Sequence, residues 1–144
     1  MTADGLAALR PTDPDGATAR YVFRLEIGPE PDAPGLWTDP GRFETTLYRA
    51  ADEPGTDGWL FFRDTLWRGE LADEPHFRRL VEDELGCPVV SASFSELRTD
   101  EAYLDALKAA IADDLPLFNA DSVSAVLNKY LGSSIRVVTS GDAA

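Results

Sequence analysis

The one histidine and the one cysteine of the chain, His76 and Cys87, are the side chains whose types first suggest catalysis. A nucleophilic cysteine needs a lowered thiol pKa and a base within hydrogen-bonding distance. Cys87 stands beside Pro88 at the start of a predicted strand, where small buried thiols are common and where no neighbour would activate it. We interpret both residues as structural, predict no catalytic residues, and favour a protein that is not an enzyme.

Paired carboxylates, the second feature that could serve chemistry, follow from composition. The 144 residues include 26 acidic ones, so pairs such as Asp113 with Asp114 arise by chance. A general acid or base needs burial to shift its pKa, whereas these pairs stand among polar neighbours. The spacings typical of EF-hands, zinc proteases, paired-cysteine sites and phosphate-binding loops do not occur. We predict no metal site and no cofactor, and only non-specific binding of salt cations.

The densest group of large side chains is DGWLFFRDTLWRGE at residues 57–70, which holds two of the three tryptophans. In one interpretation it is a core strand that runs into a turn, with Trp67 covering the next helix start and Arg68 paired to Glu70 or Asp73. In the other, Trp67 and Arg68 form an exposed recognition surface, because both residue types are enriched at interface hot spots. The candidate interaction surface consists of Leu66, Trp67, Arg68 and Arg63.

The formal net charge of −13 restricts the partners of the chain, because such a field repels nucleic acids and anionic membranes. Only two of the 13 basic residues are lysines, Lys108 and Lys129, and the acids are 16 Asp and 10 Glu. In molar salt the Debye length shrinks to about 3 Å, so repulsion among hydrated carboxylates is screened. The composition therefore predicts a salt-adapted, cytoplasmic protein that binds neither nucleic acid nor membrane.

The length and the 44% apolar composition predict a single domain, at residues 19–140. Residues 1–18 are small, acidic and interrupted by two prolines, which predicts a disordered arm, and residues 141–144 form a tail. No apolar run approaches the roughly 18 residues that a membrane helix needs. The N-terminus also lacks the basic and apolar regions of a signal peptide, so we expect neither export nor membrane insertion.

The hydrophobic periodicity predicts an α+β domain. Alternation and apolar runs predict strands at 21–27, 42–49, 59–62, 88–94 and 135–139, the third of them a central strand. Helical spacing predicts three helices. The first has the acidic residues Asp73 and Glu74 at its start and Gly86 just past its end, and the other two are capped by Thr99 or Asp100 and by Asp121 or Ser122. The order β-β-β-α-β-α-α-β predicts helices on one face of an antiparallel or mixed sheet of about five strands.

The segment Leu66, Trp67, Arg68, with WLFFRD before it and GE after it, resembles the signature of the haloarchaeal LWR-salt protein family. The scarcity of lysine and the chain length agree with this resemblance. The resemblance implies a protein restricted to extreme halophiles. It implies no activity, so only these three residues transfer, as a signature of unknown role.

Two functional hypotheses follow. The first is a non-enzymatic cytosolic module that works through a protein partner or by self-association, because the aromatic and arginine cluster around Trp67 is the one feature suited to recognition. The alternative is a small-molecule-binding or enzymatic domain with a pocket between the sheet and the helices. Nucleic-acid binding is the least favoured, since its affinity falls steeply with salt.

Overall fold

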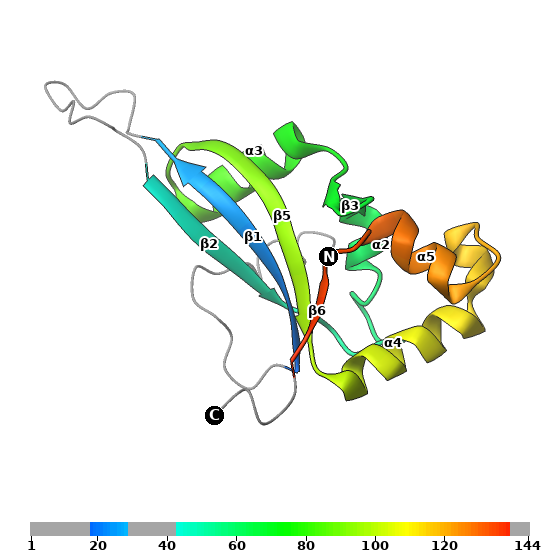
Figure 1. Ribbon diagram of the computed structural model, residues 1–144. Coiled ribbons are helices and arrows are strands. Elements are labelled where there is room, and N and C mark those ends of the chain that lie inside the picture. The colour runs from blue at the N-terminus through cyan, green and yellow to red at the C-terminus, as the bar shows by residue number, and fades with distance from the viewer. Residues whose placement is uncertain (1–17, 29–42, 139–144) are drawn as a thin grey trace, which may run out of the picture.

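The computed structural model describes residues 18–28 and 43–138. The predicted arm, apart from Thr18, lies outside these residues, as does the predicted tail 141–144. Within them the chain forms β1 (Ala19–Ile27), β2 (Phe43–Ala50), α2 (Phe61–Thr65), β3 (Leu66–Trp67), β4 (Glu70–Leu71), α3 (Glu74–Leu85), β5 (Val89–Thr99), α4 (Glu101–Asp113), the 3-10 helix η1 (Leu115–Phe118), α5 (Val123–Tyr130) and β6 (Ile135–Val137) (Figure 1).

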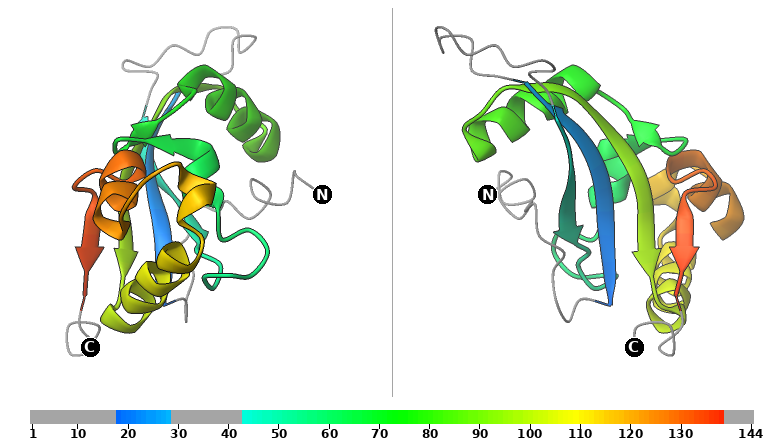
Figure 2. Two further views of the ribbon diagram at one scale, coloured as in Figure 1. Left: turned by 90° about the vertical axis from the view of Figure 1, so that its right-hand side faces the viewer. Right: turned by 60° about the vertical axis from the view of Figure 1, so that its left-hand side comes forward.

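The main sheet of the described residues has four strands in the order β2-β1-β5-β6. β1 runs antiparallel to both β2 and β5, whereas β6 runs parallel to β5, so the sheet is mixed. β3 and β4 form a separate two-stranded hairpin. The helices gather on one side of the main sheet (Figure 2). The predicted α+β fold is confirmed.

β1 lies at the centre of the sheet because one of its faces is uniformly apolar. Tyr21, Phe23, Leu25 and Ile27 alternate along it and are all buried, as the period-two pattern predicts. On the opposite face Arg24 is exposed. This alternation sets the register, since a slip of one residue would turn the four apolar side chains into solvent.

Side-chain caps set the starts of three helices; the sequence predicts the caps of α4 and α5, and for α3 only an acidic residue at its start. Asp73, Asp100 and Ser122 each accept a hydrogen bond from the backbone N–H three residues later, at 3.1, 2.7 and 3.1 Å. Gly86 ends α3 with a left-handed φ of 75°. Among the alternatives left open by the sequence, Asp100 and Ser122 are the caps of α4 and α5.

Acidic side chains of α3 bind the backbone of β5 where the short strand β6 does not reach. Glu82 accepts from the N–H of Val89 and Glu74 from the N–H of Ala92, both at 2.9 Å. Arg78 donates to the carbonyl of Val90 at 3.1 Å. β6 pairs only with residues 97–99 of β5. These carboxylates therefore hold a helix against a sheet, a role that the sequence did not indicate.

The prediction of a central strand at 59–62 was wrong. Gly58 has a left-handed φ of 87°, and the chain then turns into α2. Trp59, Phe61 and Phe62 are all buried, so the run is apolar on successive residues, a pattern that short strands and short buried helices share. Two antiparallel strands therefore open the domain, and the third predicted strand is replaced by a helix.

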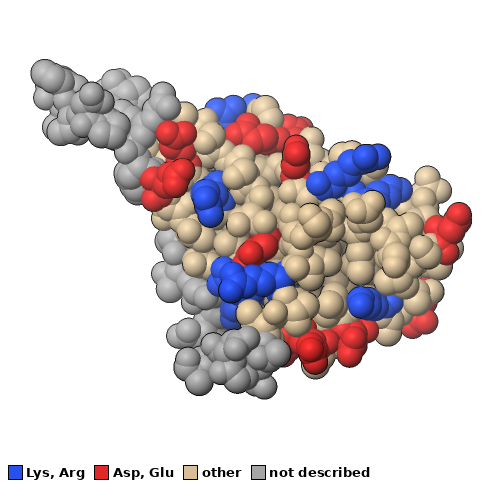
Figure 3. Space-filling model, viewed as in Figure 1, with Lys and Arg blue, Asp and Glu red and all other residues tan. Residues whose placement is uncertain are grey.

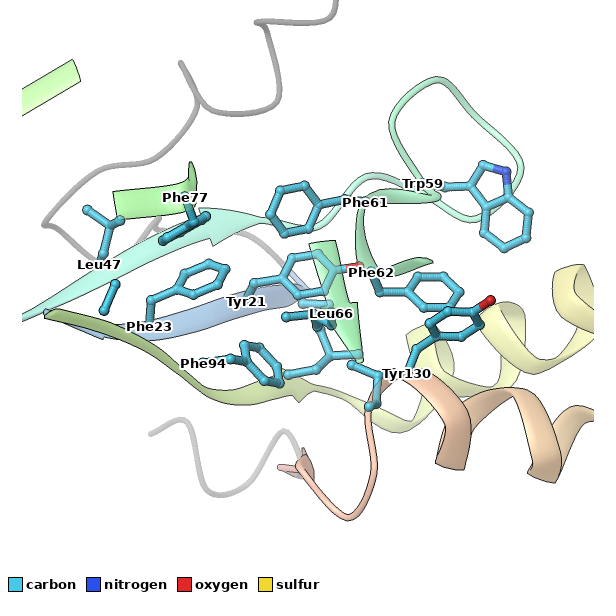
Figure 4. Packing of buried hydrophobic residues seen from close by; sticks show 14 of the residues in the cluster. Tyr21, Phe23, Leu47, Trp59, Phe61, Phe62, Leu66, Phe77, Phe94 and Tyr130 are labelled. Atoms are coloured by element: carbon cyan, nitrogen blue, oxygen red, sulfur yellow. The ribbon is translucent and has the colours of Figure 1, made fainter. Parts of the chain in front are cut away.

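α2 joins two groups of aromatic side chains into one core (Figure 4). Phe61 faces the sheet, with its ring centre 4.8 Å from that of Tyr21 and 6.2 Å from that of Phe23. Phe62 faces the other way, stacked on Phe118 of η1 at 5.7 Å and edge-on to Tyr130 of α5 at 5.9 Å. Successive residues of one short helix thus connect the sheet to the C-terminal helices.

Replacing Phe62 by Ala is expected to lower the free energy of unfolding by about 3–5 kcal/mol, because the ring is fully buried and its removal leaves a cavity. Urea denaturation at a fixed molar KCl concentration measures this change. Leu117→Ala is the control, since Leu117 is 46% exposed, and should cost about 1 kcal/mol or less. Equal losses for the two variants would contradict this assignment of the core.

Candidate functional site

The Leu66-Trp67-Arg68 segment forms one strand and half of the turn of the β3–β4 hairpin. Trp67 pairs with Glu70, so Arg68 and Gly69 make a two-residue turn. Both have positive φ, 54° and 83°, as in the type I′ turn that suits two-residue hairpins. Glycine adopts this backbone freely, whereas an arginine in the left-handed region is strained by roughly 1–2 kcal/mol.

The turn is docked on the C-terminal end of α5. The N–H of Arg68 donates to the carbonyl of Lys129 at 2.8 Å, and the N–H of Gly69 donates to that of Tyr130 at 2.9 Å. Helix ends leave their last carbonyls without partners in the helix, and here the hairpin supplies donors for two of them. A Cβ at Gly132 would lie 3.1 Å from the Arg68 carbonyl oxygen, so the two backbones are in contact.

Leu66 anchors the hairpin in the core and does not belong to its surface, since it is only 1% exposed. Trp67, by contrast, is 45% exposed. Its ring meets Tyr130 edge-on at 6.0 Å, and the Nζ of Lys129 lies 5.9 Å from its centre. Trp67 therefore rests on α5 and not on the start of α3, with much of the indole facing solvent.

The side chain of Arg68 is exposed and lies over the Trp67 ring, with the guanidinium carbon 5.6 Å from the ring centre. Within residues 18–28 and 43–138 its guanidinium makes no ion pair and no hydrogen bond. The pairing with Glu70 or Asp73 that one interpretation expected does not form, and the Asp73 carboxylate instead caps α3. The fold thus holds a strained arginine whose guanidinium contacts the Trp67 ring and no carboxylate among the described residues.

Arg63 is the fourth residue of the predicted interaction surface. It lies on α2, and its side chain contacts η1. Its side chain donates to Asp64 at 3.0 Å and to the Leu117 carbonyl at 3.4 Å. Lys129 donates to the next carbonyl, that of Phe118, at 2.8 Å. We group these residues with Trp67 and Arg68 as the LWR surface: Arg63, Trp67, Arg68, Leu117 and Lys129. Figure 3 shows basic atoms gathered over the β3–β4 hairpin and the adjoining end of α5.

The sequence did not indicate Leu117 or Lys129 as parts of this surface. Both lie about 50 residues or more from Trp67 along the chain, and no spacing rule joins positions so far apart. The one available signal was the scarcity of lysine, which made Lys129 one of two in the chain.

A second cluster of polar groups ties β2 to the helices. The guanidinium of Arg49, which is 5% exposed, lies 4.3 Å from the Phe61 ring centre and 3.1 Å from an oxygen of Asp52. The Tyr103 hydroxyl donates to the Asp52 carbonyl at 2.7 Å. Burial and the nearby Asp52 raise the pKa of Tyr103 to about 12, and burial raises that of Tyr21 further still. These contacts join secondary-structure elements and give the cluster a structural role.

The remaining candidates do not converge on a site. His76 stands in the first turn of α3 and Cys87 beyond its end, so roughly 15 Å of helix separates them. Across the described residues no group of three or more His, Cys, Asp or Glu side chains could hold a metal ion. None of the described helices is long and apolar enough to cross a membrane.

Comparison with known proteins gives one match. A family model described as LWR-salt protein matches residues 17–141, which include the whole of the described fold. No curated protein and no solved structure matches the chain.

Replacing Arg68 by Asn is expected to raise the free energy of unfolding by about 0.5–1 kcal/mol, because Asn tolerates the left-handed region and Asn-Gly is a preferred type I′ pair. Chemical denaturation measures the gain. The matched control is Arg79→Asn, at an exposed position within α3, where the lower helix propensity of Asn should cost about 0.5 kcal/mol. A loss of stability at both positions would argue against strain at Arg68.

Stability is expected to fall as the pH rises through about 10 to 12. Tyr103 has a pKa of about 12 in the fold and about 10 when unfolded, so in this window the folded state binds more protons than the unfolded state. The stabilisation that Tyr103 contributes is fully present below pH 10 and is lost as the pH rises from about 10 to about 12. Unfolding midpoints measured across it should decline less in Tyr103→Phe than in the wild type, and an equal decline would contradict the raised pKa.

Proposed function

Because the chain belongs to the LWR-salt protein family, whose description states no activity, we propose a function from the geometry of the signature: a non-enzymatic module that binds a protein through the LWR surface. The bound protein is either a separate partner or a second copy of the chain. Trp67 and Arg68 are the anchors of this surface, and Leu117 and Lys129 extend it.

The strained backbone of Arg68 is the observation that carries this proposal. Left-handed φ at a residue other than Gly or Asn costs free energy, and such residues concentrate at functional sites. Within the described residues the guanidinium gains no hydrogen bond or ion pair that would offset this strain. Its use is therefore expected in contact with another molecule.

The rigidity of the surface supports the same role. Trp67 and Arg68 are held by backbone hydrogen bonds to α5 and by the buried Leu66, so little conformational freedom remains to be lost on binding. An exposed tryptophan beside an arginine is the composition of an interface hot spot. The surface combines both features.

We further propose that the module works in a salt-rich cytosol. Two lysines among 13 basic residues and a net charge of −13 support this environment. With a Debye length of about 3 Å in molar salt, long-range attraction is screened and binding depends on direct contact. Apolar contact is retained under these conditions, which suits a surface centred on an indole.

The alternative, a small-molecule or enzymatic domain with a pocket between sheet and helices, stays a prediction. The fully buried rings of Phe23, Phe62 and Phe118 fill much of the layer between them.

Trp67→Ala is expected to abolish a complex that wild-type protein forms in lysate at native salt, because it removes the central anchor of the surface. Affinity purification followed by reconstitution from purified components measures this, and sedimentation velocity measures self-association. Arg79→Asn serves as the control and should retain the complex. If wild type, Trp67→Ala and Arg68→Asn were all monomeric and recovered no partner, the proposed function would be rejected.

A further inference from the structure

We propose that the LWR surface recognises an acidic polypeptide segment of another protein, in which carboxylates flank an apolar side chain. This inference rests on the proposed function and specifies the chemistry of the partner.

The charge of the surface is opposite to that of the chain. The chain has 26 acidic and 13 basic residues, a ratio of two to one. Arg68 and Lys129 both lie at the Trp67 ring, and Glu70 is the acid that pairs with Trp67 across the hairpin, whereas the charge of Arg63 is matched by Asp64. Such a local reversal of sign favours an acidic partner over a basic one, because like charges across an interface are unfavourable.

The three cations differ in how far their donors are already engaged. Arg63 is bound to Asp64 and to the Leu117 carbonyl, and Lys129 to the Phe118 carbonyl. Arg68, in contrast, contacts the Trp67 ring and leaves its N–H groups to solvent. A guanidinium presents these donors in a planar fork that matches a carboxylate in bidentate geometry.

Stacking on Trp67 prepares Arg68 for this role. A guanidinium on an indole face keeps its edge available, and the contact restricts a long side chain that would otherwise lose rotamer freedom on binding. Lys129, on the same ring, adds a positive charge without directional preference. Together they define a place for a carboxylate beside the indole.

The apolar component of the partner follows from Trp67 and Leu117, which are 45% and 46% exposed. Lys129 links them, since its Nζ lies 5.9 Å from the Trp67 ring centre and binds the carbonyl next to Leu117. A segment with carboxylates alone would leave both apolar side chains in water. A segment that also carries an apolar residue covers them, and that contact persists when salt screens the charges.

A nucleic acid and a second copy of the chain fit these observations less well. Three cations on a chain of net charge −13 offer few phosphate contacts, and salt weakens such contacts steeply. In a symmetric dimer formed through this surface, the same cations would face each other across the interface, which is unfavourable at contact distance. Binding of a nucleic acid, or self-association of the chain through this surface, would overturn the proposal.

The test uses the full chain and fluorescence anisotropy in molar KCl, with a short labelled peptide of Glu and Ser around two central Leu residues. Three further peptides are compared, in which Gln replaces Glu, Lys replaces Glu, or Ser replaces Leu. We expect the Glu peptide with Leu to bind at least about tenfold more tightly than each of the others, a difference of about 1.4 kcal/mol.

Arg68→Asn and Trp67→Ala should each weaken that binding by about tenfold or more, whereas Arg79→Asn should leave it unchanged. Because Arg68→Asn is expected to stabilise the fold, its loss of binding would not arise from unfolding. Equal binding of the Gln and Glu peptides, preference for the Lys peptide, or equal binding of a single-stranded oligonucleotide would overturn the acidic partner.

Sedimentation velocity separates this inference from the proposed function. A dimer of the wild type that Arg68→Asn disrupts would overturn the acidic partner protein and leave the interaction module standing. If Trp67→Ala lost a reconstituted complex but the wild type showed no preference among the peptides, the acidic partner would again be overturned. The interaction module would again stand. Absence of any complex, dimer or peptide binding would overturn both.

Discussion

Two backbone hydrogen bonds, from the Arg68 and Gly69 N–H groups to the Lys129 and Tyr130 carbonyls, determine the arrangement of the C-terminal half. They fix the β3–β4 hairpin to the end of α5, while Leu66 enters the core beneath it. Because Leu66 directly follows α2, the same contact positions the helix whose Phe61 and Phe62 connect the sheet to η1 and α5. The exposure of Trp67 is a consequence of this docking.

Charged side chains serve three different purposes in this chain. Many carboxylates are exposed and hydrated, as expected for solubility in salt. Glu74 and Glu82 instead accept backbone hydrogen bonds from β5, and buried Arg49 pairs with Asp52. Arg68 belongs to neither group, since among the described residues its guanidinium contacts the Trp67 ring and no carboxylate. Net charge therefore describes the chain as a whole, whereas the exceptions to the general pattern describe its structure and its candidate function.

Local rules of sequence predicted most of the fold. Alternation located β1, helical spacing with Gly86 at its end located α3, and the caps Asp100 and Ser122 located α4 and α5, because all these signals act within a few residues. The run at 59–62 failed because a buried aromatic segment has no period that separates strand from helix, and its helical form depends on partners in η1 and α5 that lie far along the chain. For the candidate surface, residue type alone suggested Trp67, Arg68 and Arg63, whereas Leu66, which the same pattern included, is buried in the core. Leu117 and Lys129 join the surface only through tertiary structure.

The carboxylates of α3 on β5 also bear on how the protein behaves when it is crowded. A strand whose outer N–H groups are open invites a strand of another molecule to add to the sheet, and repeated addition leads to fibres. Glu74 and Glu82 occupy such groups at Ala92 and Val89 with negatively charged side chains. The helix thus acts as a barrier to intermolecular strand addition along this stretch, and so opposes the growth of fibres from this side of β5.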